Sequence, residues 1–258
     1  MTTAVRMSHV EFDIVWERLG LGERPYPITV PVFGATTDER AVLREQVWQS
    51  LADRGLHDGT DLRPRLEDLL VLLVRNRFTI DGLLSGREQQ RILAAAGRGD
   101  AGLLLVQTDA EVRLEPVRGG DVVAAVMALV AEEKPGPGDP IGLPTALFDE
   151  AVRAYASGGH LALETALRAG GITGRELRGL STLLESARSG GGQLAANTVD
   201  RMGRRTRTPV LNWFDTEAGR YLVFAERRRD GAEWLTCAPG DSGRLSRRLT
   251  ELVAGLRV

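Results

Sequence analysis

The sequence of 258 residues contains one cysteine, Cys237, and one lysine, Lys134. A single cysteine excludes a disulfide within the chain and a zinc site built from several thiolates, and it is typical of a protein of the reducing cytoplasm. Because lysine is almost absent, arginine carries nearly all the positive charge. With the abundant alanine and glycine, this is typical of a GC-rich coding genome. Arginine also suits planar, bidentate recognition of anionic groups.

Long apolar runs are missing as well. The longest, Leu69–Val74, is too short to span a membrane, and Met1–Val10 lacks the apolar core of a signal peptide. The net charge of −2 gives no global reason to expect nucleic acid or an anionic membrane as a partner. We therefore expect a cytoplasmic protein, in which 43% hydrophobic residues suffice for a sizeable core.

The common catalytic motifs are absent: the sequence has no P-loop, HExxH or GxSxG pattern. Its three histidines, His9, His57 and His160, are scattered and have no companions in sequence. Gly97–Gly102 (GRGDAG) matches GxGxxG, but it leads into a predicted strand, whereas a dinucleotide motif opens a helix. We expect no enzyme, no cofactor and no metal; an enzyme with an unrecognised pocket is the weakest alternative.

Two stretches of the chain repeat one pattern of strand, strand, Gly-Asp turn and helix, at an offset of about 120 positions. The first comprises Gly102–Thr108, Glu111–Pro116 and Val122–Ala131, and the second Gly219–Ala225, Glu233–Ala238 and Arg244–Leu256. A half with three or four strands and one covering helix is marginal alone, so the two copies should share one sheet and one core. The pattern predicts an α+β fold with a quasi-twofold repeat.

Turn residues and apolar spacing predict two antiparallel meanders. Their remaining strands are Arg77–Leu83 and Ile92–Ala96 in the first half, and Gly192–Val199 and Thr208–Asp215 in the second. Further helices are predicted at 11–19, 38–54, 62–75, 143–156, 161–169 and 174–188. Prolines and glycines mark residues 136–142 as the linker between an N-terminal half (1–135) and a C-terminal half (143–258) of one composite domain.

Arginines crowd one segment between two predicted strands: Arg201, Arg204, Arg205 and Arg207. A basic hairpin here could bind phosphates, which makes a nucleic-acid-binding protein the alternative reading of the chain. A solvated loop is favoured, because stacking aromatics are missing and the chain is slightly acidic. These arginines could also contact acidic groups of a protein partner.

Several segments, taken in order, resemble the EspG proteins, the chaperones of actinobacterial type VII (ESX) secretion systems. They are Phe12–Pro27 (FDIVWERLGLGERPYP), Gly136-Pro137-Gly138, Arg204–Asp215 (RRTRTPVLNWFD), Gly219–Phe224 (GRYLVF), Trp234–Pro239 (WLTCAP) and Leu245–Leu256. The resemblance implies a central antiparallel sheet flanked by two helical bundles. It also implies a cytosolic chaperone that binds the hydrophobic tip of PE–PPE heterodimers, keeps them soluble and targets them to the secretion machinery.

The resemblance places partner binding on the central sheet, the C-terminal helices at about 161–188 and the loop Leu84–Gln90. To cover an apolar tip, we expect an apolar sheet face with a polar rim. The partner-binding residues predicted in this way are Gly86, Arg87, Glu88, Gln89, Trp213, Asp215, Arg220, Leu222, Phe224 and Trp234. Unpaired sheet edges also leave a homodimer open.

Overall fold

The computed structural model describes residues 4–200, 202–228 and 230–256. Within them lies one sheet of eleven strands: β1 (Val5–Met7), β2 (Phe78–Ser85), β3 (Gln90–Ala96), β4 (Ala101–Gln107), β5 (Val112–Arg118), β6 (Ile141–Pro144), β7 (Gly190–Val199), β8 (Arg205–Arg207), β9 (Leu211–Thr216), β10 (Gly219–Arg227) and β11 (Glu233–Pro239). The helices are α1 (His9–Arg18), α2 (Thr37–Asp53), α3 (Pro64–Leu72), α4 (Val122–Met127), α5 (Thr145–Ala169), α6 (Gly174–Glu185) and α7 (Ser242–Gly255), and a 3-10 turn (Gly119–Asp121) precedes α4. The predicted α+β class with a central antiparallel sheet is confirmed.

The middle of the sheet is the pair β2 and β7, one strand from each half. Outward from this pair, the first half contributes β3, β4, β5 and β1, and the second contributes β9, β10, β11 and β6. The short β8 pairs with β7 off this path. Both halves therefore have the same strand order, and α4 or α7 follows the last strand of each meander. This order is compatible with the predicted repeat.

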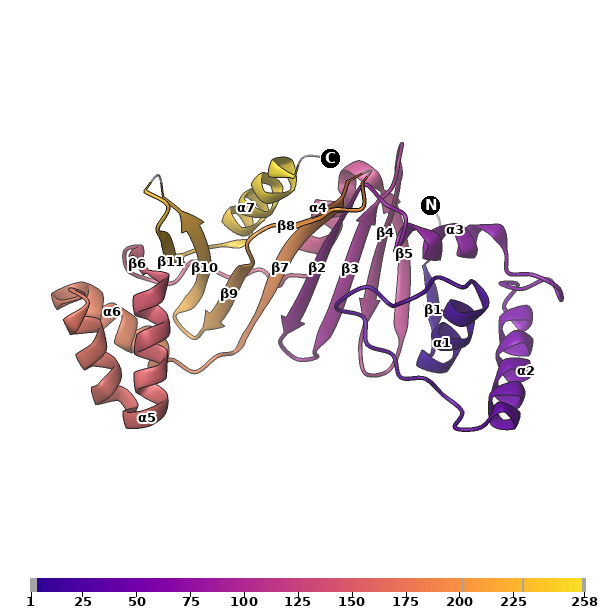
Figure 1. Cartoon of the computed structure of the whole chain (residues 1–258), viewed down its shortest axis with the longest axis horizontal. Coiled ribbons are helices and arrows are strands. Elements are labelled where there is room, and N and C mark those ends of the chain that lie inside the picture. Colours follow the sequence, from indigo (N-terminus) through magenta and orange to yellow (C-terminus); the bar gives the residue numbers. More distant parts are fainter. Residues whose placement is uncertain (1–3, 201, 229, 257–258) are drawn as a thin grey trace.

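One face of the sheet, here called the closed face, is covered by α4 and α7, which contact each other (Figure 1). Strand residues that point to it belong to both halves, among them Ile80, Leu104, Leu194 and Leu222. They pack with Val122 and Val126 of α4 and with Leu245 and Leu249 of α7. The two halves therefore share one hydrophobic core on this face.

The opposite face, here called the open face, carries two separate groups of helices (Figure 1). The N-terminal lobe (α1, α2 and α3) covers β3 to β5, where Leu93, Leu105 and Leu114 are buried beneath it. The C-terminal lobe (α5 and α6) covers β6 and β11 through Leu143 and Leu235. Between the lobes, the middle strands carry half-buried side chains on this face, so the lobes border a groove in the sheet.

The predicted linker 136–142 is a packed crossover, and its last two residues already belong to β6, which pairs with β11. A Cβ atom on Gly136 would lie 2.2 Å from Cζ of Tyr221, so a glycine is required there. The Tyr221 hydroxyl donates to the carbonyl of Pro137 at 2.9 Å. The sequence pattern does not predict this strand, because prolines stand at both of its ends.

The two helices predicted at 143–156 and 161–169 form one element, α5, which is broken at Gly159 (φ 65°, ψ −155°). The second leg folds back and packs against the first. A Cβ atom on Gly170 would lie only 2.3 Å from the side chain of Leu147. In a straight helix these residues would be about 35 Å apart. The gap between the two predicted helices is therefore the break inside α5.

The helix predicted at 38–54 is α2, and its apolar residues are not all buried. Val47 and Leu51 are buried, but Val42 is 54% exposed. The helix begins one residue earlier than expected: Thr36 caps it, and its hydroxyl accepts from Glu39 N at 3.2 Å. None of the described helices is long and apolar enough to cross a bilayer.

Candidate functional site

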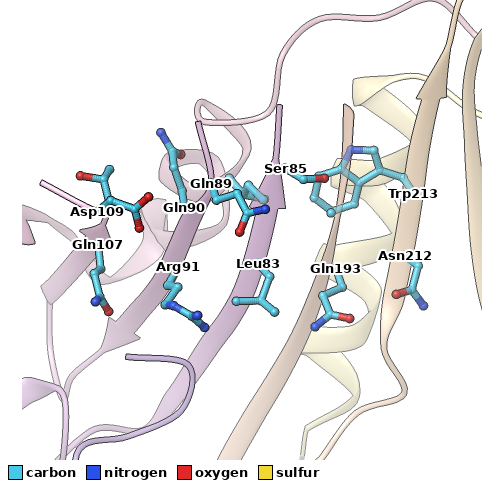
Figure 2. A pocket seen from close by; sticks show the side chains of 13 residues that line it. Leu83, Ser85, Gln89, Gln90, Arg91, Gln107, Asp109, Gln193, Asn212 and Trp213 are labelled. Carbon is cyan, nitrogen blue, oxygen red and sulfur yellow. The ribbon is translucent and has the colours of Figure 1, made fainter. Parts of the chain in front are cut away.

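Five residues at one register position form a row across the open face, here called the polar row: Gln107 of β4, Arg91 of β3, Leu83 of β2, Gln193 of β7 and Asn212 of β9 (Figure 2). They are direct neighbours in the sheet, so successive members lie about 4.8 Å apart. Four of the five are polar. The row is the floor of the groove between the two lobes.

A cavity of about 410 Å³ lies over this row. One of its walls comes from the turn between β2 and β3, through Ser85, Gln89 and Gln90, and another from Thr108 and Asp109 after β4. The floor contains one aliphatic side chain, Leu83. The apolar sheet face expected from the sequence is not seen in this row, because the apolar residues next to it in the strands, such as Leu84, Ile92 and Leu194, point to the closed face.

The predicted loop is the turn between β2 and β3. Gly86, Arg87, Glu88 and Gln89 are all exposed there, and Gln89 borders the cavity. The Ser85 hydroxyl donates to the carbonyl of Gly191 at 3.2 Å, which joins the base of the turn to β7. These four residues are accessible to a partner.

The other six predicted residues lie on strands β9, β10 and β11 with side chains on the closed face: Trp213, Asp215, Arg220, Leu222, Phe224 and Trp234. The first four are buried by the chain itself, and Asp215, Arg220 and Leu222 do not line the cavity. Trp213 still borders the cavity, because its ring lies over Gly192, where a Cβ atom would be 2.5 Å away. Phe224 and Trp234 are half-buried, with the guanidinium carbons of Arg248 and Arg228 at 4.7 and 3.3 Å from their ring centres.

Arg220 is fully buried and holds four parts of the chain together. Its guanidinium binds both carboxylate oxygens of Asp215, at 2.6 and 2.9 Å. It also donates to the carbonyl of Ala131 after α4, at 2.9 Å, and to the hydroxyl of Ser242 at the start of α7, at 3.2 Å. Arg220 is therefore structural.

No sequence motif points to Arg91, Leu83, Gln193 and Asn212. Each of the three polar residues is a single side chain in a strand, and their proximity depends on the register of strands that are far apart in the chain. The only available signal was a polar residue on an otherwise apolar strand.

The segment that borders the groove on the side of the N-terminal lobe is the loop from Arg24 to Phe33. Its Thr29 is bonded twice by Gln107: Thr29 N donates to Oε1 at 2.9 Å, and Nε2 donates to the Thr29 carbonyl at 2.6 Å. Tyr26 extends from the same loop towards β7, where Nε2 of Gln193 donates to its hydroxyl at 3.4 Å.

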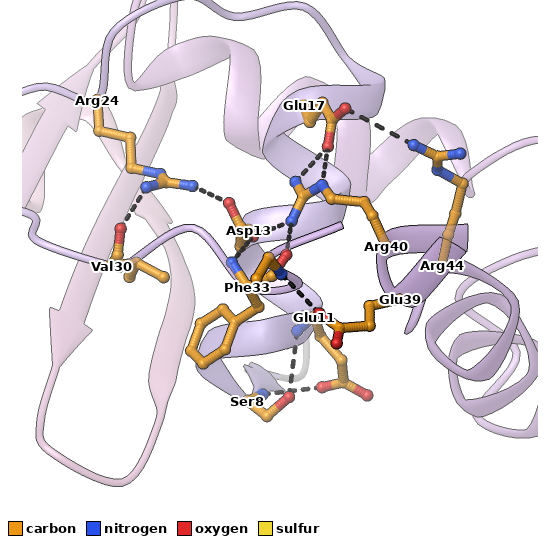
Figure 3. A network of polar contacts seen from close by, with 11 residues as sticks. Ser8, Glu11, Asp13, Glu17, Arg24, Val30, Phe33, Glu39, Arg40 and Arg44 are labelled. Atoms are coloured by element: carbon orange, nitrogen blue, oxygen red, sulfur yellow. Dashed lines mark hydrogen bonds and ion pairs between the residues drawn. The ribbon is translucent and has the colours of Figure 1, made fainter. Parts of the chain in front are cut away.

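The carboxylate of Asp13, on α1, fixes this loop from beneath (Figure 3). It pairs with Arg24, accepts from Arg40 Nη1 at 2.6 Å and accepts from Phe33 N at 3.0 Å. Burial by itself raises the pKa of Asp13. The hydrogen bonds from Arg40 and Phe33 and the charges of both arginines outweigh this effect, so the pKa lies below its ordinary value of 3.8.

Replacement of Asp13 is expected to change how stability depends on pH. A carboxyl group with a lowered pKa in the folded chain stabilises it fully above about pH 4, and this contribution is lost as the pH falls below that value. Asp13→Asn should lower the free energy of unfolding by about 3 kcal/mol at pH 7. Urea unfolding between pH 3 and pH 7 should show a weaker loss of stability in acid than the wild type. An unchanged acid slope would contradict this role.

Beyond Asn212, aromatic side chains continue the open face. The rings of Phe214 and Tyr221 stack at 5.5 Å, and the guanidinium carbon of Arg188 lies 3.4 Å from the centre of the Phe214 ring. Cys237 is buried nearby, and burial raises the pKa of its thiol to about 11, although Arg188 partly opposes the shift.

The Cys237 thiol should therefore be inert in the folded chain. Burial and the scarcity of thiolate at pH 8 should make its reaction with iodoacetamide at least about 100-fold slower than in urea-unfolded protein. Mass spectrometry of timed, quenched reactions measures both rates. Equal rates would show that this end of the open face does not pack as described.

The arginine-rich hairpin is the basis of the nucleic-acid alternative. One of its arginines forms an ion pair within the fold. Arg201 lies outside the described residues. Arg207 binds the buried carboxylate of Asp81, with Nη2 at 2.8 Å from Oδ1. Arg204 and Arg205 are exposed. Within the part of the chain that the structure describes, no group of three His, Cys, Asp or Glu side chains could hold a metal ion.

Comparison with known proteins agrees with this architecture. No curated protein matches the chain in sequence. Among solved structures, it is similar to the Mycobacterium tuberculosis type VII secretion system chaperone EspG5, determined in complex with a PE25–PPE41 dimer, with a TM-score of 0.75 and 16% identity over 98% of this chain and 97% of that chain. The model of the EspG family matches residues 8–251. The resemblance inferred from the sequence is therefore confirmed, and the chain belongs to the EspG family.

Proposed function

We propose that the protein is a chaperone that binds PE–PPE heterodimers, keeps them soluble and targets them to a type VII secretion system. Family membership over residues 8–251 is the observation that carries this proposal. The similar fold of EspG5, whose structure contains a PE25–PPE41 dimer, supports it. The work would take place in the cytoplasm, before export, and requires neither catalysis nor a cofactor.

The groove on the open face is the surface we assign to the partner. It combines a cavity of about 410 Å³, the exposed turn Gly86 to Gln89 and the polar row, in which Leu83, Gln193 and Asn212 are half-buried. The predicted contribution of the helices at 161–188 is supported by exposed apolar side chains on the C-terminal lobe. Leu161 is 77% exposed and Leu184 38%. Such residues suit the apolar patch of a helical tip.

The proposal is tested by co-expression of the chain with each PE–PPE pair encoded by its own organism, followed by size-exclusion chromatography with light scattering. We expect a stable complex with one copy of each chain for at least one pair. No co-purifying complex with any pair would refute the proposal. Salt-dependent binding to DNA or RNA that is lost in Arg204→Ala/Arg205→Ala would instead support the nucleic-acid alternative.

A further inference from the structure

One member of the polar row shows how the row can bind a main chain. The amide of Gln107 pairs with both the N–H and the C=O of Thr29, at 2.9 and 2.6 Å. The loop that contains Thr29 crosses the open face above β4. The Thr29 side chain points away from the sheet, since Thr29 is exposed whereas Gln107 is buried. A primary amide offers both a donor and an acceptor, so it satisfies both polar groups of one residue.

The same row continues beyond this loop with two more primary amides, those of Gln193 and Asn212 (Figure 2). Both are half-buried and border the cavity. Gln193 uses one donor for the Tyr26 hydroxyl, at 3.4 Å. Among the described residues, its Oε1 and the whole amide of Asn212 have no hydrogen-bond partner. Polar groups in a half-buried site stabilise a complex when a partner satisfies them.

We propose that the open part of the polar row binds an extended main-chain segment of the PE–PPE partner, in the way Gln107 binds Thr29. The amides of Gln193 and Asn212 pair with backbone N–H and C=O groups of this segment, and Leu83 contacts one of its side chains. The inference rests on the proposed function and adds the chemistry of recognition. The neutral, bifunctional amides match a peptide backbone better than they match an apolar patch or a phosphate.

This recognition has a consequence for selectivity. Every residue except proline presents the same backbone donor and acceptor, so the amides accept segments of different sequence. Discrimination between PE–PPE pairs must then come from residues that meet side chains. Arg91 in the row, Asp109 in the wall after β4, and the exposed Arg87 and Glu88 of the β2–β3 turn are charged residues placed for this.

The test replaces the two amides with apolar side chains of similar size. Gln193→Leu and Asn212→Leu should each weaken binding of the full-length chaperone to its PE–PPE pair about 10-fold, and the double variant about 100-fold. Isothermal titration calorimetry measures the dissociation constants. An apolar docking site would respond in the opposite way, because both changes enlarge the apolar floor. The matched control is Gln46→Leu on the exposed surface of α2, which should bind like the wild type.

The outcomes separate this inference from the proposed function. Unchanged or tighter binding by the double variant would overturn main-chain recognition and leave the chaperone function in place. A wild-type chain that binds no pair would overturn both. Light scattering of the chain alone tests whether a second copy of the chain occupies the groove. A homodimer of the wild type that is lost in the double variant would show that it does, and would contradict the proposal. Thermal unfolding confirms that each variant is folded.

Discussion

Arg220→Met is expected to lower the free energy of unfolding by about 3–5 kcal/mol. The change removes the partner of the buried Asp215 carboxylate and leaves that charge uncompensated in the interior. It also removes the donors to the Ala131 carbonyl and the Ser242 hydroxyl, so the ends of α4 and α7 lose a shared contact with β10. Urea unfolding followed by circular dichroism measures the loss.

A second substitution separates the charge from the packing. Asp215→Leu/Arg220→Met should recover much of the lost stability, because two apolar side chains leave no buried charge unpaired. Arg204→Met, on the exposed β7–β8 turn, is the matched control and should change stability by no more than about 0.5 kcal/mol. A cost below about 1 kcal/mol for Arg220→Met would contradict the structural role of this ion pair.

Leu83→Arg is expected to weaken binding to the PE–PPE pair more than about 100-fold, equivalent to about 2.7 kcal/mol. Leu83 lies in the middle of the polar row, beside Arg91 and Gln193. A long cationic side chain there fills the cavity and adds a like charge next to Arg91. Leu83 belongs to none of the hydrophobic core clusters, so the fold should tolerate the change.

The control for this variant places the same charge on an exposed aliphatic residue outside the groove. Val42→Arg on α2, where the side chain is 54% exposed, should bind like the wild type. Co-purification followed by calorimetry compares the affinities of the wild type, Leu83→Arg and Val42→Arg for the PE–PPE pair. Equal affinity for Leu83→Arg would mean that the partner does not use the groove, and would move the contact surface to the C-terminal lobe.

Local sequence patterns predicted much of the fold because they report burial directly. Leu103 to Val106 is apolar at every position, and in the structure odd-numbered residues of β4 face the N-terminal lobe while even-numbered ones face α4 and α7. Val112 and Leu114, which alternate with charged residues in the sequence, likewise lie on the buried face of β5. β6 was missed because four residues flanked by prolines carry too little pattern to distinguish a strand from a linker.

The surface that we assign to the partner was harder to predict, for a reason that alternation itself explains. A period of two separates the residues of a strand into two sets, but it does not say which set a helix covers. On β10 the predicted set, Arg220, Leu222 and Phe224, is the one that faces α7. The polar row consists of residues on the open face. Its amides, those of Gln193 and Asn212, lie side by side with Leu83 only because β2 pairs with β7 and β7 pairs with β9.

The central pairing of β2 with β7 also determines when the groove can exist during synthesis. Its floor takes Gln107, Arg91 and Leu83 from the first half of the chain, and Gln193 and Asn212 from the second. The first meander can assemble on the ribosome, but until β7 emerges its strand β2 is an unpaired edge. A truncated or half-folded chain therefore lacks the complete floor, so the ability to bind a partner is itself a sign that the chaperone has finished folding.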